Sequence, residues 1–205
     1  MTQRTGGAYL PLYRPRIYDL VQTLVGTNRS HRVLARDYIK ASPGDRILDM
    51  GCGTAEILPA LGDVLYTGFD INEDYIATAR ARFPSARFFV GSNADLENSG
   101  QTFDLVIALS VLHHLEDEAV SELMATANRV LRPGGRLLTY DGCFEPHQNP
   151  LARFLLQKDR GRFVRTEEHY LRLACHSFPD VRSTLRRDLL NIPCTLIIME
   201  ASRPE

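Results

Sequence analysis

The feature that most constrains the fold is a regular alternation of two kinds of segment between residues 46 and 141. Short runs rich in aliphatic, β-branched and aromatic residues, which are typical of strands, are separated by longer amphipathic stretches, which are typical of helices. One short run, residues 103–110, is apolar on consecutive residues, as expected for a central parallel strand covered on both faces. The alternation therefore predicts βαβ units and a doubly wound α/β fold with a mostly parallel sheet.

The same pattern predicts the individual elements, and Ser30 is a suitable cap for an early helix. We expect strands at residues 46–50, 65–71, 87–91, 103–110 and 135–141, followed by two final strands at 181–190 and 194–202. We expect helices at residues 15–24, 30–41, 55–61, 73–83, 117–131, 151–158 and 167–178.

Length and charge limit the classes of function. The chain has 205 residues, enough for one domain with a substantial core and too few for two full domains. Its formal net charge of −1 gives no overall attraction to nucleic acid or to an acidic membrane. Partners must therefore be inferred from local motifs.

The cysteines and the apolar runs indicate the compartment. Cys52, Cys143, Cys175 and Cys194 are scattered, without a CxxC pair or metal-ligand spacing, so we expect neither a disulfide framework nor a metal site. The N-terminus lacks an apolar signal core, and the longest apolar run, residues 105–112 interrupted by Ser110, is too short to cross a bilayer. We therefore expect a cytoplasmic protein that does not span a membrane.

A glycine turn, "DMGCGTA", follows the first strand of the alternating region and begins with Asp49. In doubly wound sheets, ligands lie beyond the carboxyl ends of the strands, where a strand leads into its helix. Glycines there allow the backbone to approach a ligand, and the next helix offers free amide groups at its N-terminus. The turn therefore predicts a nucleotide-like ligand.

Two cofactor classes compete for this turn. A dinucleotide fingerprint, GxGxxG or GxGxxA, needs a small residue where Glu56 stands, so that match fails. "LDMGCGTA" instead resembles the DxGxGxG turn of class I S-adenosylmethionine-dependent methyltransferases, with Ala55 in place of the last glycine. The resemblance implies S-adenosylmethionine as cofactor, S-adenosylhomocysteine as its product, and a seven-stranded, mostly parallel Rossmann-like sheet in which the last strand, residues 195–201, is antiparallel.

Further motifs follow in the order that this family has them. Asp70 stands twenty-one residues after Asp49, at the end of the second strand, where the family has an acid for the ribose hydroxyls; Rossmann dehydrogenases share this acid. In "VGSNAD", Ser92 or Asn93 replaces the family's usual Asp at the adenine, and Asp95 is another candidate. "FDLVIALSVLHHL" and "LRPGGRLL" match the segments around the fourth and fifth strands.

The resemblance implies a set of cofactor contacts. For Asp49, orientation of the turn and contact with the cofactor's amino group stand beside a purely turn-stabilising role. For Asp70, the alternative is a helix N-cap, for which Asn72 is the stronger candidate. The full set of expected cofactor residues is Asp49, Gly51, Cys52, Gly53, Asp70, Ile71, Ser92, Asn93, Ala94 and Leu109.

Methyl transfer from a sulfonium needs in-line positioning of the acceptor and does not require a dedicated base. Imidazole titrates near neutrality, and the histidines at 113 and 114 follow a central strand at its ligand-facing end. A structural role for this pair is favoured over catalysis. The candidates for a base, if one is used, are His113, Asp141, His147 and Tyr140.

The acceptor side carries the least specific signals. One hypothesis is that the segment around residues 153–165 covers the site and attracts a carboxylated or phosphorylated acceptor; the alternative is a solvated helical face. The cations of this segment are Arg153, Lys158, Arg160, Arg162 and Arg165. The N-terminal region can likewise contact the cofactor through Tyr13, Arg29 and His31, or simply pack on the sheet.

These observations predict a single class I methyltransferase domain over residues 1–205 that acts on a small molecule. The run that family members use on nucleobase or glutamine amines, Asn/Asp-Pro-Pro-aromatic, is replaced here by "ALSVLHHL". The domain would comprise N-terminal helices at 1–44, a cofactor-binding core at 45–142, a helical insertion or lid at 143–179 and terminal strands at 180–205. The alternatives are a regulatory protein that binds the cofactor without turnover, an RNA or protein methyltransferase, and an NAD-dependent oxidoreductase.

Overall fold

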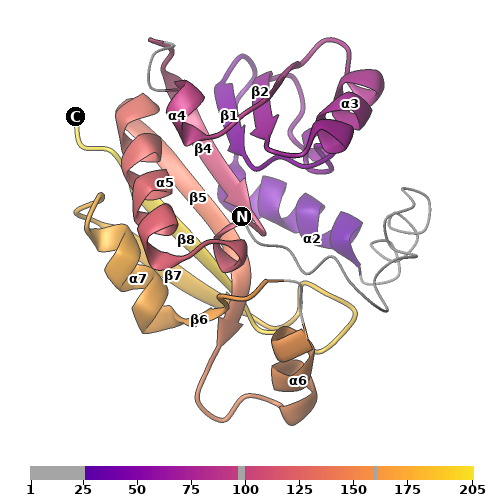
Figure 1. Cartoon of the computed structure of the whole chain (residues 1–205), viewed down its shortest axis with the longest axis vertical. Helices are drawn as coiled ribbons and strands as arrows, with labels where there is room; N and C mark the ends of the chain where they lie inside the picture. Colours follow the sequence, from indigo (N-terminus) through magenta and orange to yellow (C-terminus); the bar gives the residue numbers. More distant parts are fainter. Residues whose placement is uncertain (1–25, 97–99, 159–160) are drawn as a thin grey trace.

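A computed structural model describes residues 26–96, 100–158 and 161–205. Seven strands form the main sheet in the order β3-β2-β1-β4-β5-β8-β7 (Figure 1). Their bounds are β1 Arg46–Met50, β2 Leu65–Asp70, β3 Arg87–Val90, β4 Phe103–Leu109, β5 Leu131–Phe144, β7 Val181–Arg186 and β8 Leu196–Ser202. A two-residue strand, β6 (Arg165–Thr166), pairs with the end of β5 outside this path.

The strand directions confirm the predicted doubly wound sheet. β1 pairs in parallel with β2 and β4, and the pairs β2–β3 and β4–β5 are parallel as well. β8 lies between β5 and β7 and is antiparallel to both. The predicted insertion of an antiparallel last strand is therefore confirmed.

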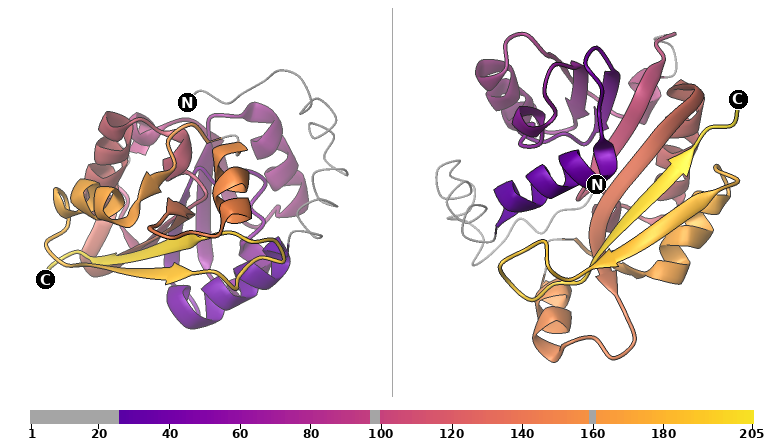
Figure 2. Two further views of the ribbon diagram at one scale, coloured as in Figure 1. Left: turned by 90° about the horizontal axis from the view of Figure 1, so that it is seen from below. Right: turned by 180° about the vertical axis from the view of Figure 1, so that it is seen from behind.

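Helices cover both faces of the sheet (Figure 2). The helices are α2 Thr27–Leu34, α3 Glu73–Arg82, α4 Asn93–Leu96, α5 Asp117–Val130, α6 Pro150–Lys158 and α7 Glu167–Cys175, with a π-helical turn at Ala35–Ile39 and 3-10 turns at Leu58–Ala60 and Leu112–His114. Apolar side chains of α5 and α7 pack with one face of the central strands, and those of α2 and α3 pack with the other. The sheet is thus buried on both sides, which explains the uninterrupted apolar run of β4.

The structure corrects two expected helices, and a third lies outside the described residues. The helix expected at 55–61 is wrong: only a 3-10 turn forms, because Pro59 cannot donate a helical hydrogen bond and its ring opposes a longer α-helix. The helix expected from Ser30 begins instead at Thr27, and Ser30 is fully buried within it rather than capping it. The helix expected at residues 15–24 falls outside the described part of the chain.

Two features of β5 shape the ligand-facing end of the sheet. Leu109, the last residue of β4, is paired with Tyr140, so β5 continues four residues beyond its neighbour, to Phe144. Helix α6 packs against this extension, since a β-carbon on Gly142 would lie 2.7 Å from Leu156 Cδ2.

All four cysteines are described and are free thiols. Among the described helices, none has the length and apolar character needed to cross a membrane.

Candidate functional site

The glycine turn after β1 is pinned to the neighbouring strand β2. The backbone N–H groups of Gly51 and Cys52 both donate to the carbonyl of Phe69, each at 2.9 Å. Gly51 and Gly53 have φ angles of 76° and 53°, in the left-handed region that favours glycine. Both glycines are therefore required by the backbone path that carries the turn across the end of the sheet.

Asp70, at the end of β2, connects the two strand ends. Its Oδ1 accepts the N–H of Asn72 at 2.9 Å, and its Oδ2 accepts the N–H of Gly53 at 3.0 Å. Burial raises the pKa of this carboxyl, and the hydrogen bonds to the backbone oppose that shift. Each oxygen keeps further accepting capacity, and a β-carbon on Gly53 would meet nothing within 4 Å. An open space beside a half-buried double acceptor fits a ligand with two neighbouring hydroxyl groups.

Asn72, rather than Asp70, caps the helix that follows. Asn72 Oδ1 accepts the N–H groups of Asp74 and Tyr75 at 3.0 and 3.2 Å, at the start of α3. The preference for Asn72 as the cap is confirmed. The Asp70 carboxylate lies instead between the backbone N–H groups of Gly53 and Asn72.

Asp49 is buried beneath the turn, with 3% of its surface exposed. The hydroxyl of Tyr66 donates to Asp49 Oδ2 at 2.5 Å. Burial raises the pKa of Asp49 to about 7, the Tyr66 hydrogen bond opposes this, and the charge of Asp70 adds to it. A buried carboxyl that titrates near neutrality would be driven to its charged form by a cationic ligand group nearby.

A second turn, after β3, lies beside Asp70 at the same end of the sheet. Asp95 Oδ2 accepts from the backbone N–H and the hydroxyl of Ser92, at 2.8 and 3.3 Å, so this carboxylate holds the turn in shape. Gly91 donates its N–H to the carbonyl of Asp70 at 3.0 Å, which ties the turn to β2. Ser92 is exposed, and Ile71 is 49% exposed. Asn93 is half-buried and Ala94 is exposed within the first turn of α4.

The turn after β4 contacts the glycine turn directly. A β-carbon on Gly51 would lie 2.8 Å from Val111 Cγ2, so this side chain rests against the glycine. Ser110 has a φ of 59° and donates its N–H to the carbonyl of Tyr140 at 2.6 Å. Leu109, just before it, is half-buried. The turns after β1, β3 and β4 are therefore joined at one end of the sheet.

The structure brings two of the four candidate bases together. His113 Nδ1 lies 2.7 Å from Asp141 Oδ1, and the backbone N–H of His113 donates to the same oxygen at 3.2 Å. The two residues are 6% and 1% exposed, and burial raises the pKa of Asp141 against the opposing effect of His113. A β-carbon on Gly161 would lie 2.0 Å from His113 Cδ2, so this segment covers the imidazole. The enclosure favours a structural role for the pair.

The other two candidates lie elsewhere. Tyr140 is on the opposite face of β5 from Asp141, where its hydroxyl accepts from Ser30 Oγ at 3.0 Å; burial raises its pKa. His147 is exposed in the loop after β5, with a φ of 57°.

The cations of the 153–165 segment do not form one surface. Arg165 is 5% exposed, whereas Arg162 is exposed. The Arg153 guanidinium lies 5.3 Å from the centre of the Phe144 ring, and Lys158 Nζ lies 5.8 Å from that of Phe154. Arg160 is outside the described residues. Arg165 is enclosed by protein and so is not available to an anionic acceptor, while the hypothesis that the segment as a whole attracts one stays a prediction.

The candidate residues of the N-terminal region also differ in their exposure. His31 is half-buried, and burial lowers its pKa while the nearby Glu56 opposes this. Arg29 is exposed on α2, and Tyr13 lies outside the described residues.

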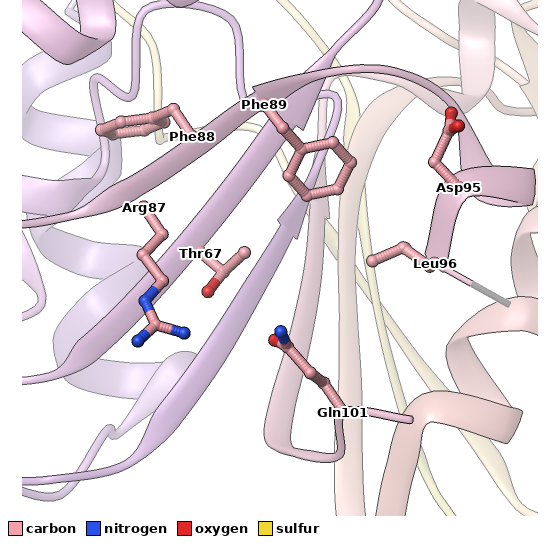
Figure 3. A pocket seen from close by; sticks show the side chains of 7 residues that line it. All are labelled: Thr67, Arg87, Phe88, Phe89, Asp95, Leu96 and Gln101. Atoms are coloured by element: carbon pink, nitrogen blue, oxygen red, sulfur yellow. The ribbon is translucent and has the colours of Figure 1, made fainter. Parts of the chain in front are cut away.

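A separate cavity of about 250 Å³ lies along β2 and β3 (Figure 3). The side chains of Thr67, Arg87, Phe89 and Gln101 surround it, together with Phe88, Asp95 and Leu96. Thr67 precedes Asp70 by three residues on β2, and Asp95, which holds the turn after β3, also lines the cavity.

Comparison with known proteins gives a consistent family. Residues 47–135 match a family model described as a methyltransferase domain. The chain is 38% identical over 114 residues to a 27-O-demethylrifamycin SV methyltransferase of Amycolatopsis mediterranei (strain S699), covering 50% of this chain and 40% of that protein. It is 33% identical over 128 residues to an O-methyltransferase of Aspergillus sclerotiorum, covering 57% of this chain and 48% of that protein. The chain thus spans less than half the length of either relative.

Solved structures share the fold. The chain superposes with a TM-score of 0.75 on a structure described as a complex between the Haloferax volcanii Trm112 methyltransferase activator and the putative methyltransferase, at 17% identity and covering 98% of this chain and 100% of that one. It superposes with a TM-score of 0.65 on a TehB-like methyltransferase from Corynebacterium glutamicum, at 21% identity and covering 96% and 99% of the two chains. At these identities the likeness establishes the architecture alone.

Proposed function

We propose that the chain is a class I S-adenosylmethionine-dependent methyltransferase, since residues 47–135 match a methyltransferase domain, and that it transfers a methyl group from S-adenosylmethionine to a hydroxyl group of a small molecule. The observation that carries this proposal is the position of Asp70, whose two oxygens accept N–H groups from Gly53 and Asn72 while the space beside Gly53 is open. A carboxylate in this position suits a ribose, since it can accept from both hydroxyl groups.

The described residues fit the cofactor part by part. Asp70 would bind the ribose hydroxyls, and Ile71 with the turn at Ser92 would flank the adenine. Asp49, which lies beneath the glycine turn, would orient the turn and stabilise the cationic amino group of the cofactor. When bound, S-adenosylmethionine supplies an electrophilic methyl carbon on its sulfonium.

The acceptor would approach from the side of the β5 extension. The chain's task there is to hold the acceptor oxygen in line with the methyl carbon and to exclude water, which can account for a large part of the rate enhancement. The named activities of the two similar proteins, both O-methyltransferases, support a hydroxyl acceptor. We assign no general base, because His113 is covered by Gly161 and Tyr140 is engaged by Ser30.

The test is turnover with S-adenosylmethionine labelled in its methyl group, against a panel of hydroxylated aromatic and polyketide compounds, amines, thiols, transfer RNA and protein extract. The proposal predicts label in a hydroxylated small molecule and formation of S-adenosylhomocysteine. Label only in RNA or protein would contradict the acceptor class. Cofactor binding without turnover on the whole panel would favour a regulatory protein.

A further inference from the structure

Arg165 is a buried cation that holds the turn after β4. Its Nη1 donates to the carbonyls of Leu112 and Phe163, each at 2.9 Å, and its Nη2 donates to the carbonyl of Leu115 at 2.6 Å. Its Nε donates to Asp117 Oδ1 at 2.8 Å. The guanidinium therefore donates hydrogen bonds to carbonyl groups at both ends of the 3-10 turn at Leu112–His114 and to the side chain of the first residue of α5.

The same turn contacts both sides of the site. On one side Val111 rests against Gly51, within the proposed cofactor turn. On the other side His113 is hydrogen-bonded to Asp141 and covered by Gly161, and its carbonyl accepts the N–H of Phe163 at 3.0 Å. The turn is thus a continuous packed connection between the cofactor side and the segment at residues 161–166.

We propose that Arg165 is a positioning residue that couples the segment at residues 161–166 to the cofactor-binding glycine turn, acting through the turn that carries Val111 and His113. The proposal rests on the proposed function, because it takes the glycine turn to be the cofactor site. The guanidinium of Arg165 is buried and bonded to protein groups, so its effect on the cofactor would be transmitted by packing.

An arginine is needed because the hydrogen-bond acceptors around the side chain lie in different directions. The planar guanidinium presents five N–H donors in a fixed fork, whereas the ammonium of lysine is a single point at the end of a flexible chain. Asp117 supplies the countercharge and also accepts His169 Nε2 at 2.8 Å, which ties the start of α7 to the same group. Loss of the fork would leave buried carbonyls unsatisfied while the charge remained.

A double-mutant cycle in cofactor affinity tests this role. The variants are Arg165→Lys, Val111→Ala and the double variant, and Arg162→Lys is the matched control because Arg162 is exposed on the same segment. The probe is S-adenosylhomocysteine, titrated by calorimetry at a temperature where every variant is folded. We expect Arg165→Lys to weaken binding about tenfold, Arg162→Lys to leave it unchanged, and Arg165→Lys to have little further effect once Val111 is Ala.

A spectroscopic readout separates positioning from general loss of stability. In protein labelled with ¹⁵N-histidine, the ring Nδ1 resonance of His113 should shift in Arg165→Lys, with no cofactor present, and stay in place in Arg162→Lys. A folded Arg165→Lys variant with wild-type affinity, an unshifted His113 resonance, or effects that simply add with Val111→Ala would overturn the coupling. If the wild-type protein itself does not bind S-adenosylhomocysteine, the proposed function fails instead.

Discussion

Tyr66 donates its hydroxyl hydrogen to Asp49 across the parallel pair of strands β1 and β2, at 2.5 Å and beneath the glycine turn. Burial raises the pKa of Asp49 to about 7, so this carboxyl is mostly neutral below that pH and mostly charged above it. A cationic ligand prefers the charged form, and its binding should therefore release a proton near neutrality. We expect affinity for S-adenosylhomocysteine, which carries the amino group, to rise between pH 6 and pH 8, as measured by calorimetry in buffers of different ionisation enthalpy.

Two variants make this prediction specific. Asp49→Asn should remove most of the pH dependence. Tyr66→Phe removes the hydrogen bond that lowers the pKa of Asp49, so the rise in affinity should move to higher pH. The raised pKa also makes the stability of the fold depend on pH. Because the folded-state pKa of Asp49 lies above its unfolded value, the contribution of Asp49 to the free energy of unfolding is lost as the pH rises through about 7. A wild-type profile unaffected by either substitution would remove Asp49 from the site.

Asp70→Ala should weaken the cofactor by about 2–3 kcal/mol, or about a hundredfold, because two charge-assisted hydrogen bonds to the ribose are lost. Asp63→Asn, on an exposed residue before β2, is the control and should bind normally. The measurement is calorimetric titration with S-adenosylhomocysteine, with circular dichroism to show that both proteins are folded. Equal affinities would exclude Asp70 as the ribose acid.

The two glycines of the turn should respond differently to alanine. Gly51→Ala places a β-carbon 2.8 Å from Val111 Cγ2, so we expect the free energy of unfolding to fall by about 1–3 kcal/mol from overpacking and from the positive φ. Gly53→Ala carries the same strain from its positive φ but projects its methyl group into open space, so we expect a smaller loss of stability than in Gly51→Ala together with impaired cofactor binding. Urea unfolding and cofactor titration of both variants separate the effects, and identical losses of both properties in both variants would contradict the assignment.

His113→Leu should act mainly on stability. It leaves the buried Asp141 without its imidazole partner, and we expect the free energy of unfolding to fall by about 3 kcal/mol at pH 8. Because burial raises the pKa of Asp141, the loss should shrink as the pH is lowered and the carboxyl becomes neutral, and Asp141→Asn in the same background should restore part of it. A variant of normal stability whose turnover falls and loses the acid limb of its pH profile would instead make His113 a base.

The sheet could be predicted because the properties that define it are local. A strand covered on both faces must be apolar on consecutive residues, and β4 meets this condition over residues 105–109. The glycine turn and Asp70 could be located because each follows a strand end, and parallel strand ends meet at one edge. The 55–61 helix was predicted wrongly because its apolar spacing outweighed Pro59, which the structure shows to be decisive.

The buried polar contacts could not be predicted in the same way. Arg165 belongs to a run of cations, and charge spacing alone does not reveal which of them is enclosed. His113 and Asp141 were each candidates, but they are 28 residues apart and their pairing depends on the register of β4 and β5 and on the turn after β4. The closeness of Gly161 to His113 depends on a segment whose sequence shows no motif.

Parallel titration of the wild-type protein with S-adenosylhomocysteine and with NAD tests the central claim most directly. The fold and the glycine turn are compatible with either nucleotide, whereas Glu56 opposes the close helix packing of a dinucleotide fingerprint. The account predicts saturable one-to-one binding of S-adenosylhomocysteine that is weakened in Asp70→Ala, and no saturable binding of NAD. Saturable binding of NAD with none of S-adenosylhomocysteine would contradict it.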